Sequence, residues 1–306
     1  MRSGTRRNRL FRSAVLALVV AVGVTAVPDD AGGATAHPGS GYWMLGEDGL
    51  IYPFGTASLC GDVFDDYYPS VSPPYEVAVD IAATPDGRGY WVLDSGGYVA
   101  YHHCEYNSGF SHPQWDYIHN EFVPSLRDDE EPVSLSPTPD GRGYWVFTDR
   151  GRAIPIGTAQ WFGDMGSVAL NGPILDSVAT PTGRGYWMVA SDGGIFAFGD
   201  AQFSGSMGGR RLNAPVMSMA PDPDGTGYWL VASDGGIFAF GAPFYGSMGA
   251  TRLNEPVSGI VAGPTGAGYL MVAFDGGIFA FGDVPFHGSL GATPPAFAVI
   301  SVAVMP

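Results

Sequence analysis

The strongest constraint on the fold of this chain is an internal repeat. The segment GYWLVASDGGIFAFGAPFYGSMG, which starts at Gly227, has near copies that start at Gly185 and Gly268. Its first Tyr recurs along the chain at Tyr42, Tyr90, Tyr144, Tyr186, Tyr228 and Tyr269. A period of about 40 to 50 residues indicates a supersecondary unit that stacks against its own copies. We therefore expect six units, two of which carry insertions.

Each repeat reads as four short strands, which we call segments a, b, c and d. In one repeat these are APVMSMAPD, GYWLVAS, GIFAFG and PFYGSMG, rich in β-branched or aromatic residues and bounded by Gly and Pro. The a-b connections have the pattern Pro-x-Gly-x-Gly, and the b-c connections contain Asp-Gly, which are both typical of tight hairpins. Helical periodicity is absent. The sequence predicts an all-β, six-bladed β-propeller with four-stranded antiparallel blades.

The two ends of the chain predict how the ring closes. The first repeat begins at segment b, with Gly41-Tyr42-Trp43, and lacks a segment a before it. The C-terminal AFAVISVAVMP reads as a lone segment a. A propeller must close its ring or leave open sheet edges. We therefore expect residues 297–305 to complete the first blade beside residues 41–63.

The first 36 residues have the pattern of a cleaved secretory signal peptide. Five Arg residues precede an apolar run from Ala14 to Val27, and Ala34-Thr35-Ala36 offers a small-x-small cleavage site. Val24-Thr25-Ala26 offers a second. A retained membrane anchor is less favoured, because the run is shorter than the roughly 20 apolar residues that span a bilayer. We expect a secreted, extracellular protein with a single domain over residues 37–306.

The charge of the mature chain limits the class of partner. Cleavage after Ala36 removes five Arg and two acidic residues, which changes the formal net charge from −16 to −19. A chain with this much negative charge is an unfavourable partner for nucleic acid. No nucleophile elbow, phosphate-binding loop or HExxH motif occurs.

Two long insertions are the main departures from the repeat. They follow segment d of the first two repeats, at residues 62–77 and 110–133. The d-a loops share one face of a propeller with the b-c turns, and loops of this length are often functional. Their aromatic side chains are suited to stacking against a sugar or a peptide, or alternatively plug the entrance of the ring. The candidate ligand-binding residues are Tyr67, Tyr68, Tyr75, Trp115, Tyr117 and Phe122.

Residues of metal-ligand type gather in the second repeat. They are His102, His103, Cys104, His112, Asp116, His119 and Glu121. Their spacing matches no zinc motif. Alignment of His102 and His103 with Gly199 and Asp200 places them at a c-d turn, on the opposite face from the insertion. We therefore expect no metal and no cofactor.

Other acidic residues have structural interpretations that we favour over cation binding. Asp48, Asp192, Asp234 and Asp275 precede Gly in b-c turns, where Asp is a good turn residue; Ser95 and Arg150 interrupt the series. The insertions contain Asp65, Asp66, Asp128, Asp129, Glu130 and Glu131. We expect these to be solvated loop charges, with weak calcium binding as the alternative.

The only two cysteines, Cys60 and Cys104, fall at similar positions of neighbouring repeats. They align with Ser204 and Ala201, near the start of segment d. An exported chain meets an oxidising medium, where a disulfide persists. We therefore expect a Cys60–Cys104 disulfide that ties the first blade to the second.

The repeat also resembles a known class of proteins. The pattern GYWxVASDGGIFAFGDA is similar to a repeat of secreted actinobacterial proteins, and the strand order resembles that of NHL-like six-bladed propellers. The resemblance covers nearly all of residues 41–306, and is closest in the last three repeats. It implies a secreted propeller and carries no catalytic motif to this chain.

These observations favour a secreted, non-enzymatic, monomeric binding propeller. Its partner would be a glycan, another cell-envelope component or a protein, bound by the d-a loop face over the first three blades. The second hypothesis is a propeller hydrolase or lyase that acts on a carbohydrate or a lactone, with carboxylates drawn from Asp65, Asp66, Asp116 and Glu121. The third is a structural or assembly module.

Overall fold

The computed structural model describes residues 40–62, 77–104 and 121–306, all within one compact unit, Ala36–Pro306. The regular elements of these residues are β-strands. Among the described residues we find no helix that could span a membrane.

The strands form six antiparallel sheets, each containing one segment a strand, one segment b strand and one segment c strand. Segment a gives β3 (Ala78–Ala83), β7 (Pro132–Pro137), β10 (Ile174–Ala179), β13 (Val216–Pro221), β16 (Val257–Ala262) and β19 (Val299–Val304). Segment b gives β1 (Gly41–Gly46), β4 (Gly89–Asp94), β8 (Gly143–Thr148), β11 (Gly185–Ala190), β14 (Tyr228–Ala232) and β17 (Gly268–Ala273). Segment c gives β2 (Ile51–Gly55), β5 (Tyr98–His103), β9 (Ala153–Gly157), β12 (Ile195–Gly199), β15 (Ile237–Phe240) and β18 (Ile278–Gly282).

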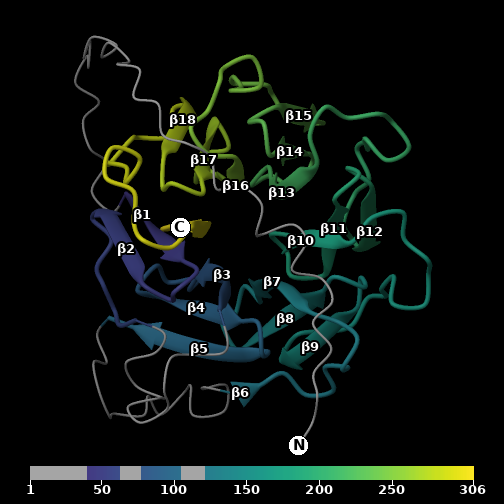
Figure 1. Ribbon diagram of the computed structural model, residues 1–306. Helices are drawn as coiled ribbons and strands as arrows, with labels where there is room; N and C mark the ends of the chain where they lie inside the picture. The colour runs from purple at the N-terminus through teal and green to yellow at the C-terminus, as the bar shows by residue number, and fades with distance from the viewer. Residues whose placement is uncertain (1–39, 63–76, 105–120) are drawn as a thin grey trace, which may run out of the picture. The chain divides into compact units, whose positions relative to one another are not determined.

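The segment a strands are the inner strands of a closed ring. Each contacts the segment a strand of both neighbouring sheets, in the order β3, β7, β10, β13, β16, β19 and back to β3. Figure 1 shows the six sheets arranged around this ring. The fold is therefore the predicted six-bladed β-propeller. We number the blades 1 to 6, from the sheet that contains β1 to the sheet that contains β17.

The C-terminal strand closes the ring in blade 1, as the sequence predicts. β19 pairs antiparallel with β1, in a register that sets Val304 opposite Tyr42 and Val302 opposite Met44. The sheet order is β19-β1-β2. The first and last strands of the propeller are thus hydrogen-bonded neighbours, which removes both open edges.

The Tyr-Trp pair of segment b builds the junctions between blades. Successive residues of a strand point to opposite faces of its sheet. The Tyr side chain therefore packs toward one neighbouring blade and the Trp side chain toward the other. Trp187 and Tyr228 share one buried cluster, and Trp229 and Tyr269 share the next. Leu270 takes the Trp position in blade 6 and packs with Tyr42 of blade 1. Six such clusters of apolar side chains constitute the core.

One described blade has a fourth strand, β6 (Glu121–Phe122), which pairs with β5 but belongs to the second insertion and not to the predicted segment d. In the other five blades, segment d is irregular among the described residues. Its backbone turns through a glycine in the left-handed region, such as Gly205 with φ 146°. A Cβ at Gly205 would collide with the ring of Phe240 in the next blade, so no other residue fits. Segment d therefore packs against the next blade at Gly205, and does not form the expected ladder of hydrogen bonds with segment c.

The Cys60–Cys104 disulfide is formed, and it joins segment d of blade 1 to the end of β5 in blade 2. The two Cα atoms are 4.4 Å apart, and 44 residues separate the cysteines in sequence. A cross-link that closes a loop of this length stabilises a fold by about 4 kcal/mol in the chain-entropy model. The bond therefore reinforces the blade that the C-terminal strand completes.

Candidate functional site

Segment d is held in place by two side chains that reach it from different blades. In blade 4, the indole N–H of Trp187 donates to the carbonyl of Gln202 at 2.8 Å. From the next blade, the Tyr228 hydroxyl donates to the carbonyl of Gly205 at 2.6 Å and accepts the backbone N–H of Ser204. Burial raises the pKa of this hydroxyl, which keeps it protonated as a donor. The same anchoring by Trp and Tyr recurs at segment d of blades 1 and 5.

One apolar side chain lies exposed at the same position of segment d in each of five blades. The position precedes the amide that binds the Tyr hydroxyl in all five. In four of the blades it also follows the carbonyl that accepts the Trp N–H, whereas blade 6 has Leu270 in place of that Trp. We call the set the rim residues: Leu59, Trp161, Phe203, Phe244 and Phe286. Their exposed fractions run from 51% at Leu59 to 61% at Phe203. In blade 2 the equivalent position lies outside the described residues.

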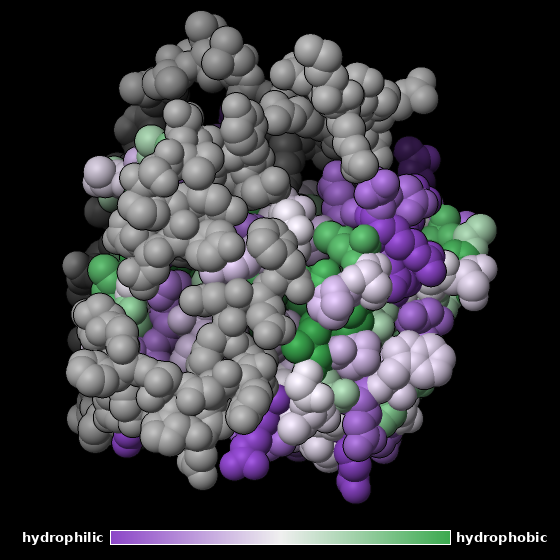
Figure 2. Space-filling model, turned by 90° about the horizontal axis from the view of Figure 1, so that it is seen from below, coloured by the Kyte–Doolittle hydropathy of each residue, from purple (hydrophilic) through white to green (hydrophobic). Residues whose placement is uncertain are grey.

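The rim residues are far more exposed to solvent than the large apolar side chains of segment b. The Trp residues of segment b are at most 2% exposed, whereas Trp161 is 60% exposed. Figure 2 shows apolar residues lying open among polar ones on one face of the described surface. Isolated exposed apolar residues are ordinary, but the same exposed position in blade after blade is not. The repeat therefore presents a regular apolar feature on a fixed backbone.

The sequence-predicted ligand residues are mostly outside the part of the chain that the structure describes. Tyr67, Tyr68 and Tyr75 lie in residues 63–76, and Trp115 and Tyr117 lie in residues 105–120. Phe122 lies on the short strand β6, beside the edge of β5. The carboxylates proposed for an enzyme are similarly placed. Asp65, Asp66 and Asp116 fall outside the described residues, and Glu121 precedes Phe122 on β6.

The turn aspartates have the structural role that we favoured. The Oδ1 atom of Asp192 accepts the N–H of Gly194 at 2.9 Å, and Asp234 and Asp275 make the same bond. Asp48 accepts the N–H of Leu50 at 3.2 Å. Each carboxylate thus caps its own hairpin.

The expectation of a solvated charge was wrong for Glu130. Its side chain is 1% exposed and forms an ion pair with Arg152 of the b-c connection in blade 3. The Glu130 carboxylate also accepts the backbone N–H of Arg127 at 2.9 Å and the Thr148 hydroxyl at 3.3 Å. A buried carboxylate requires this number of donors. The end of the second insertion is therefore packed onto blade 3, whereas Asp128 and Asp129 are exposed as expected.

The histidines of blade 2 stand one position from where the sequence alignment placed them. Strand pairing sets His102 opposite Tyr90 and His103 opposite Gly89, so they are equivalent to Phe198 and Gly199. His102 thus takes the place of the Phe that packs on segment d, and contacts Gly61. Its neighbour His103 lies 3.2 Å from the Asp86 carboxylate, and tethers the a-b turn to the c-d turn. Cys104 shifts by one position in the same way, to the place of Asp200.

His112 and His119 lie outside the described residues. No group of three or more His, Cys, Asp and Glu side chains that could hold a metal occurs in residues 40–62, 77–104 and 121–306.

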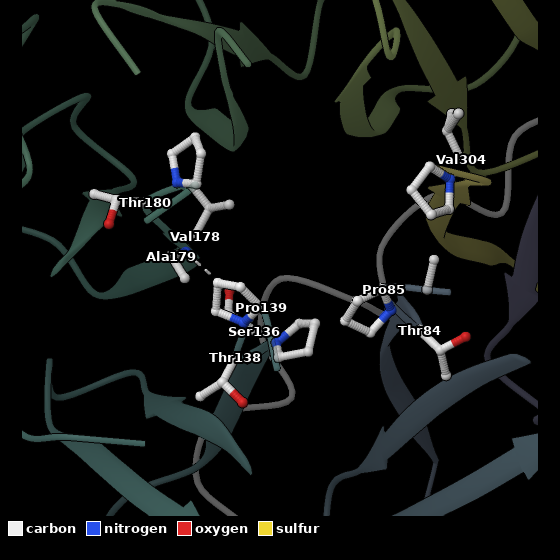
Figure 3. Close-up of a pocket in the computed structure, with 13 residues that line it drawn as sticks. Thr84, Pro85, Ser136, Thr138, Pro139, Val178, Ala179, Thr180 and Val304 are labelled. Atoms are coloured by element: carbon white, nitrogen blue, oxygen red, sulfur yellow. Dashed lines mark hydrogen bonds between the residues drawn. The ribbon is translucent and has the colours of Figure 1, made fainter. Parts of the chain in front are cut away.

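A cavity of about 300 Å³ opens where the a-b turns meet at one end of the ring. Figure 3 shows its labelled side chains converging from blades 1 to 4. The lining is made of Ala, Val, Pro, Ser and Thr residues, whose side chains carry no carboxyl, imidazole or thiol. The hydroxyls of Thr84, Thr138 and Thr180 lie within hydrogen-bond distance of an Asp carboxylate and of a backbone carbonyl in their own turns. This cavity suits an apolar group rather than acid-base chemistry.

Two carboxylates with strongly raised pKa values lie on the inner strands. Burial and the charge of Asp176 raise the pKa of Asp80 to about 7. Burial raises the pKa of Asp176 to about 6. Shifts of this kind are typical of functional sites and also of structural networks. Neither residue stands out in the sequence, because each is the only charged residue of a mainly apolar segment.

Comparison with known proteins supports the architecture. No family model and no curated protein matches the chain. Among solved structures, a chain in the "Crystal structure of Nidogen/Laminin Complex" is similar, with a TM-score of 0.56 and 10% sequence identity. The match covers 88% of this chain and 99% of that chain. At this identity the likeness shows the propeller fold alone.

Proposed function

We propose that this chain is a secreted, non-enzymatic propeller that binds a macromolecular partner through its rim residues. The partner is a glycan, another cell-envelope component or a protein. The observation that carries the proposal is the recurrence of one exposed apolar side chain in each of five described blades, at a position anchored by Tyr in all five and also by Trp in four. The aromatic residues Tyr67, Tyr68, Tyr75, Trp115, Tyr117 and Phe122 of the d-a loop face are proposed as a second contact.

The anchoring of the rim favours binding for an energetic reason. Ordering flexible groups at an interface costs free energy, so a contact on a rigid backbone loses less of its gross binding energy. Trp161 illustrates this preorganisation, because its indole N–H lies 3.3 Å from the Asp164 carboxylate and leaves the ring face open. Large aromatic side chains are also the commonest anchors of protein interfaces.

Two further observations support the proposal. The similar solved structure is described as a nidogen/laminin complex, which is an assembly of proteins. The Cys60–Cys104 disulfide is consistent with export, since such bonds persist in oxidising compartments. We propose accordingly that residues 1–36 are a cleaved signal peptide, that residues 37–306 are a single monomeric domain, and that the repeat belongs to the secreted actinobacterial class.

The alternative functions have weaker support in the geometry. A hydrolase or lyase needs carboxylates that reach a substrate, whereas Asp80 and Asp176 accept hydrogen bonds from the ring itself. A purely structural module gives no reason for exposing an aromatic residue in four successive repeats. We therefore place binding first.

The test is to incubate the mature chain, residues 37–306, with three separate immobilised fractions: cell-envelope polysaccharides, whole envelope particles and secreted proteins. We expect saturable retention on one fraction and no release of soluble sugars or other products. Product release would replace the proposal by the enzyme, and absence of retention on all three fractions would leave only the structural module.

A further inference from the structure

The inner strands carry an oxygen-bearing residue at one equivalent position of five blades. Every inner strand has a β-bulge, and the residue next to the bulge has the same register against its segment b partner in all six sheets. These ring residues are Asp80, Ser134, Asp176, Ser218, Gly259 and Ser301, in order from blade 2 to blade 1. Because the inner strands contact one another around the ring, these residues form one layer within it.

The two carboxylates of the layer are satisfied only by uncharged donors. Asp80 accepts the N–H of Leu135 from blade 3 and the hydroxyl of Ser301 from blade 1, both at 2.8 Å. Asp176 accepts the hydroxyl of Ser218 at 2.6 Å and the N–H of Met219 at 3.0 Å, both from blade 5. The six inner strands contain no Arg, Lys or His. Two buried carboxylates that repel one another therefore lack a positive partner from these strands.

A second observation concerns the inner strand between those that carry the two carboxylates. Ser134 occupies the ring position on β7, between Asp80 on β3 and Asp176 on β10. It is 1% exposed, and its hydroxyl has no hydrogen-bond partner among the described residues. Its equivalents Ser218 and Ser301 each donate to a carboxylate. A buried hydroxyl without a partner is costly, so a ligand that engages it would remove this cost.

We propose that the layer binds one hard divalent cation of the calcium type, held by the carboxylates of Asp80 and Asp176 and by the Ser134 hydroxyl. Such a cation takes oxygen ligands in flexible geometry and completes its coordination with water or carbonyl groups. The layer has no nitrogen or sulfur ligand, which disfavours zinc and the softer metals. The bound ion supplies the missing positive charge, accepts the orphaned hydroxyl as a ligand and ties blades 2, 3 and 4 together. This inference departs from the sequence expectation of no metal, and stands independently of the rim.

The experiment uses the mature chain stripped with EDTA at pH 8, where both carboxylates are largely ionised. We expect calorimetric titration with calcium chloride to show one site per chain. We also expect Tm to rise by about 5 °C at a calcium concentration one hundred times Kd. The double variant D80N/D176N should show no rise. The matched control D128N/D129N removes the same charge from exposed loop positions, and should keep the full rise.

Two further measurements keep the test decisive if D80N/D176N does not fold. Ser134→Ala removes only the orphaned hydroxyl, so we expect an unchanged or higher Tm without calcium and a several-fold weaker Kd with it. At pH 6.5 calcium binding should release about one proton per chain, since the carboxylates titrate near this pH. No calcium-dependent rise in the wild type, an equal rise in D80N/D176N, or an unchanged Kd in Ser134→Ala would each overturn the proposal.

Discussion

Deletion of residues 298–306 is expected to abolish cooperative folding of the propeller. The deletion removes β19, and with it the hydrogen-bonded partner of β1. It also removes Val299 and Val302 from one blade junction and Ala303 from the next. Burial of each Val contributes about 1.5 to 3 kcal/mol, and each lost hydrogen bond costs about 0.5 to 1.5 kcal/mol. The sum is comparable to the whole stability of a typical domain, about 5 to 15 kcal/mol.

The measurement is thermal unfolding followed by circular dichroism, with a circular permutant as the control. The permutant joins Pro306 to Gly41 through Thr-Gly-Arg, which copies the hairpin between Pro181 and Gly185, and opens the chain before Ala298. We expect no cooperative transition for the deletion and a Tm within a few degrees of the mature chain for the permutant. A deletion variant that melts cooperatively near the parent Tm would show that β19 does not close the ring.

Substitution of Asp80 by Asn is expected to flatten the pH dependence of stability between pH 4 and pH 8. The pKa of Asp80 is raised from 3.8 to about 7 in the folded state, so the folded chain binds more protons than the unfolded chain in this window. Stability therefore falls as the pH rises through 7. The linkage amounts to at most about 4 kcal/mol for this carboxyl. Asp176 contributes in the same direction with a pKa of about 6.

Urea unfolding at fixed pH values in EDTA measures this dependence. The wild type should lose stability from pH 4 to about pH 7 and level off by pH 8, and Asp80→Asn should lose markedly less. Carboxyls with lowered pKa values, such as Asp140 and Asp200, act below this window because their stabilisation is lost as the pH falls through the folded pKa. Asp128→Asn, at an exposed position, is the matched control. An identical slope in Asp80→Asn and the wild type would contradict this account of the ring.

The sequence was sufficient to predict the propeller because each junction repeats the same few residues. Gly and Tyr at the start of segment b, followed by Trp in five of six repeats, mark the strands that are buried on both faces, and Tyr42 without a preceding segment a marks the closure. Cys60 and Cys104 were correctly paired because segment d of one blade lies against the end of segment c in the next blade, as Ser204 lies beside Gly241. Patterns that recur at a fixed period leave little freedom in topology.

The irregular segment d, the exposed rim residues and the layer of ring residues could not be predicted from the sequence, because they depend on where the backbone departs from the regular strand pattern. Segment d looks like a strand, but Gly205 adopts a conformation that breaks the ladder. Phe203 resembles a core residue in composition, and only the anchoring on either side of it shows that it faces solvent. The alignment of Asp80 with Ser134 and Asp176 becomes visible only once the bulges fix the register.

The central claim is that the repeat is a scaffold that presents its rim residues to a partner. Its most direct test is equilibrium binding of the fluorescently labelled mature chain to the fraction that retains it, with Tm measured in parallel. The rim variant replaces Trp161, Phe203, Phe244 and Phe286 by Gln. The control replaces Leu50, Val168 and Phe297, which are 43 to 54% exposed outside the rim, by Gln. We predict that the rim variant binds at least tenfold more weakly with an unchanged Tm, and that the control stays within about threefold of the wild type. Equal binding by the rim variant and the wild type would contradict the claim.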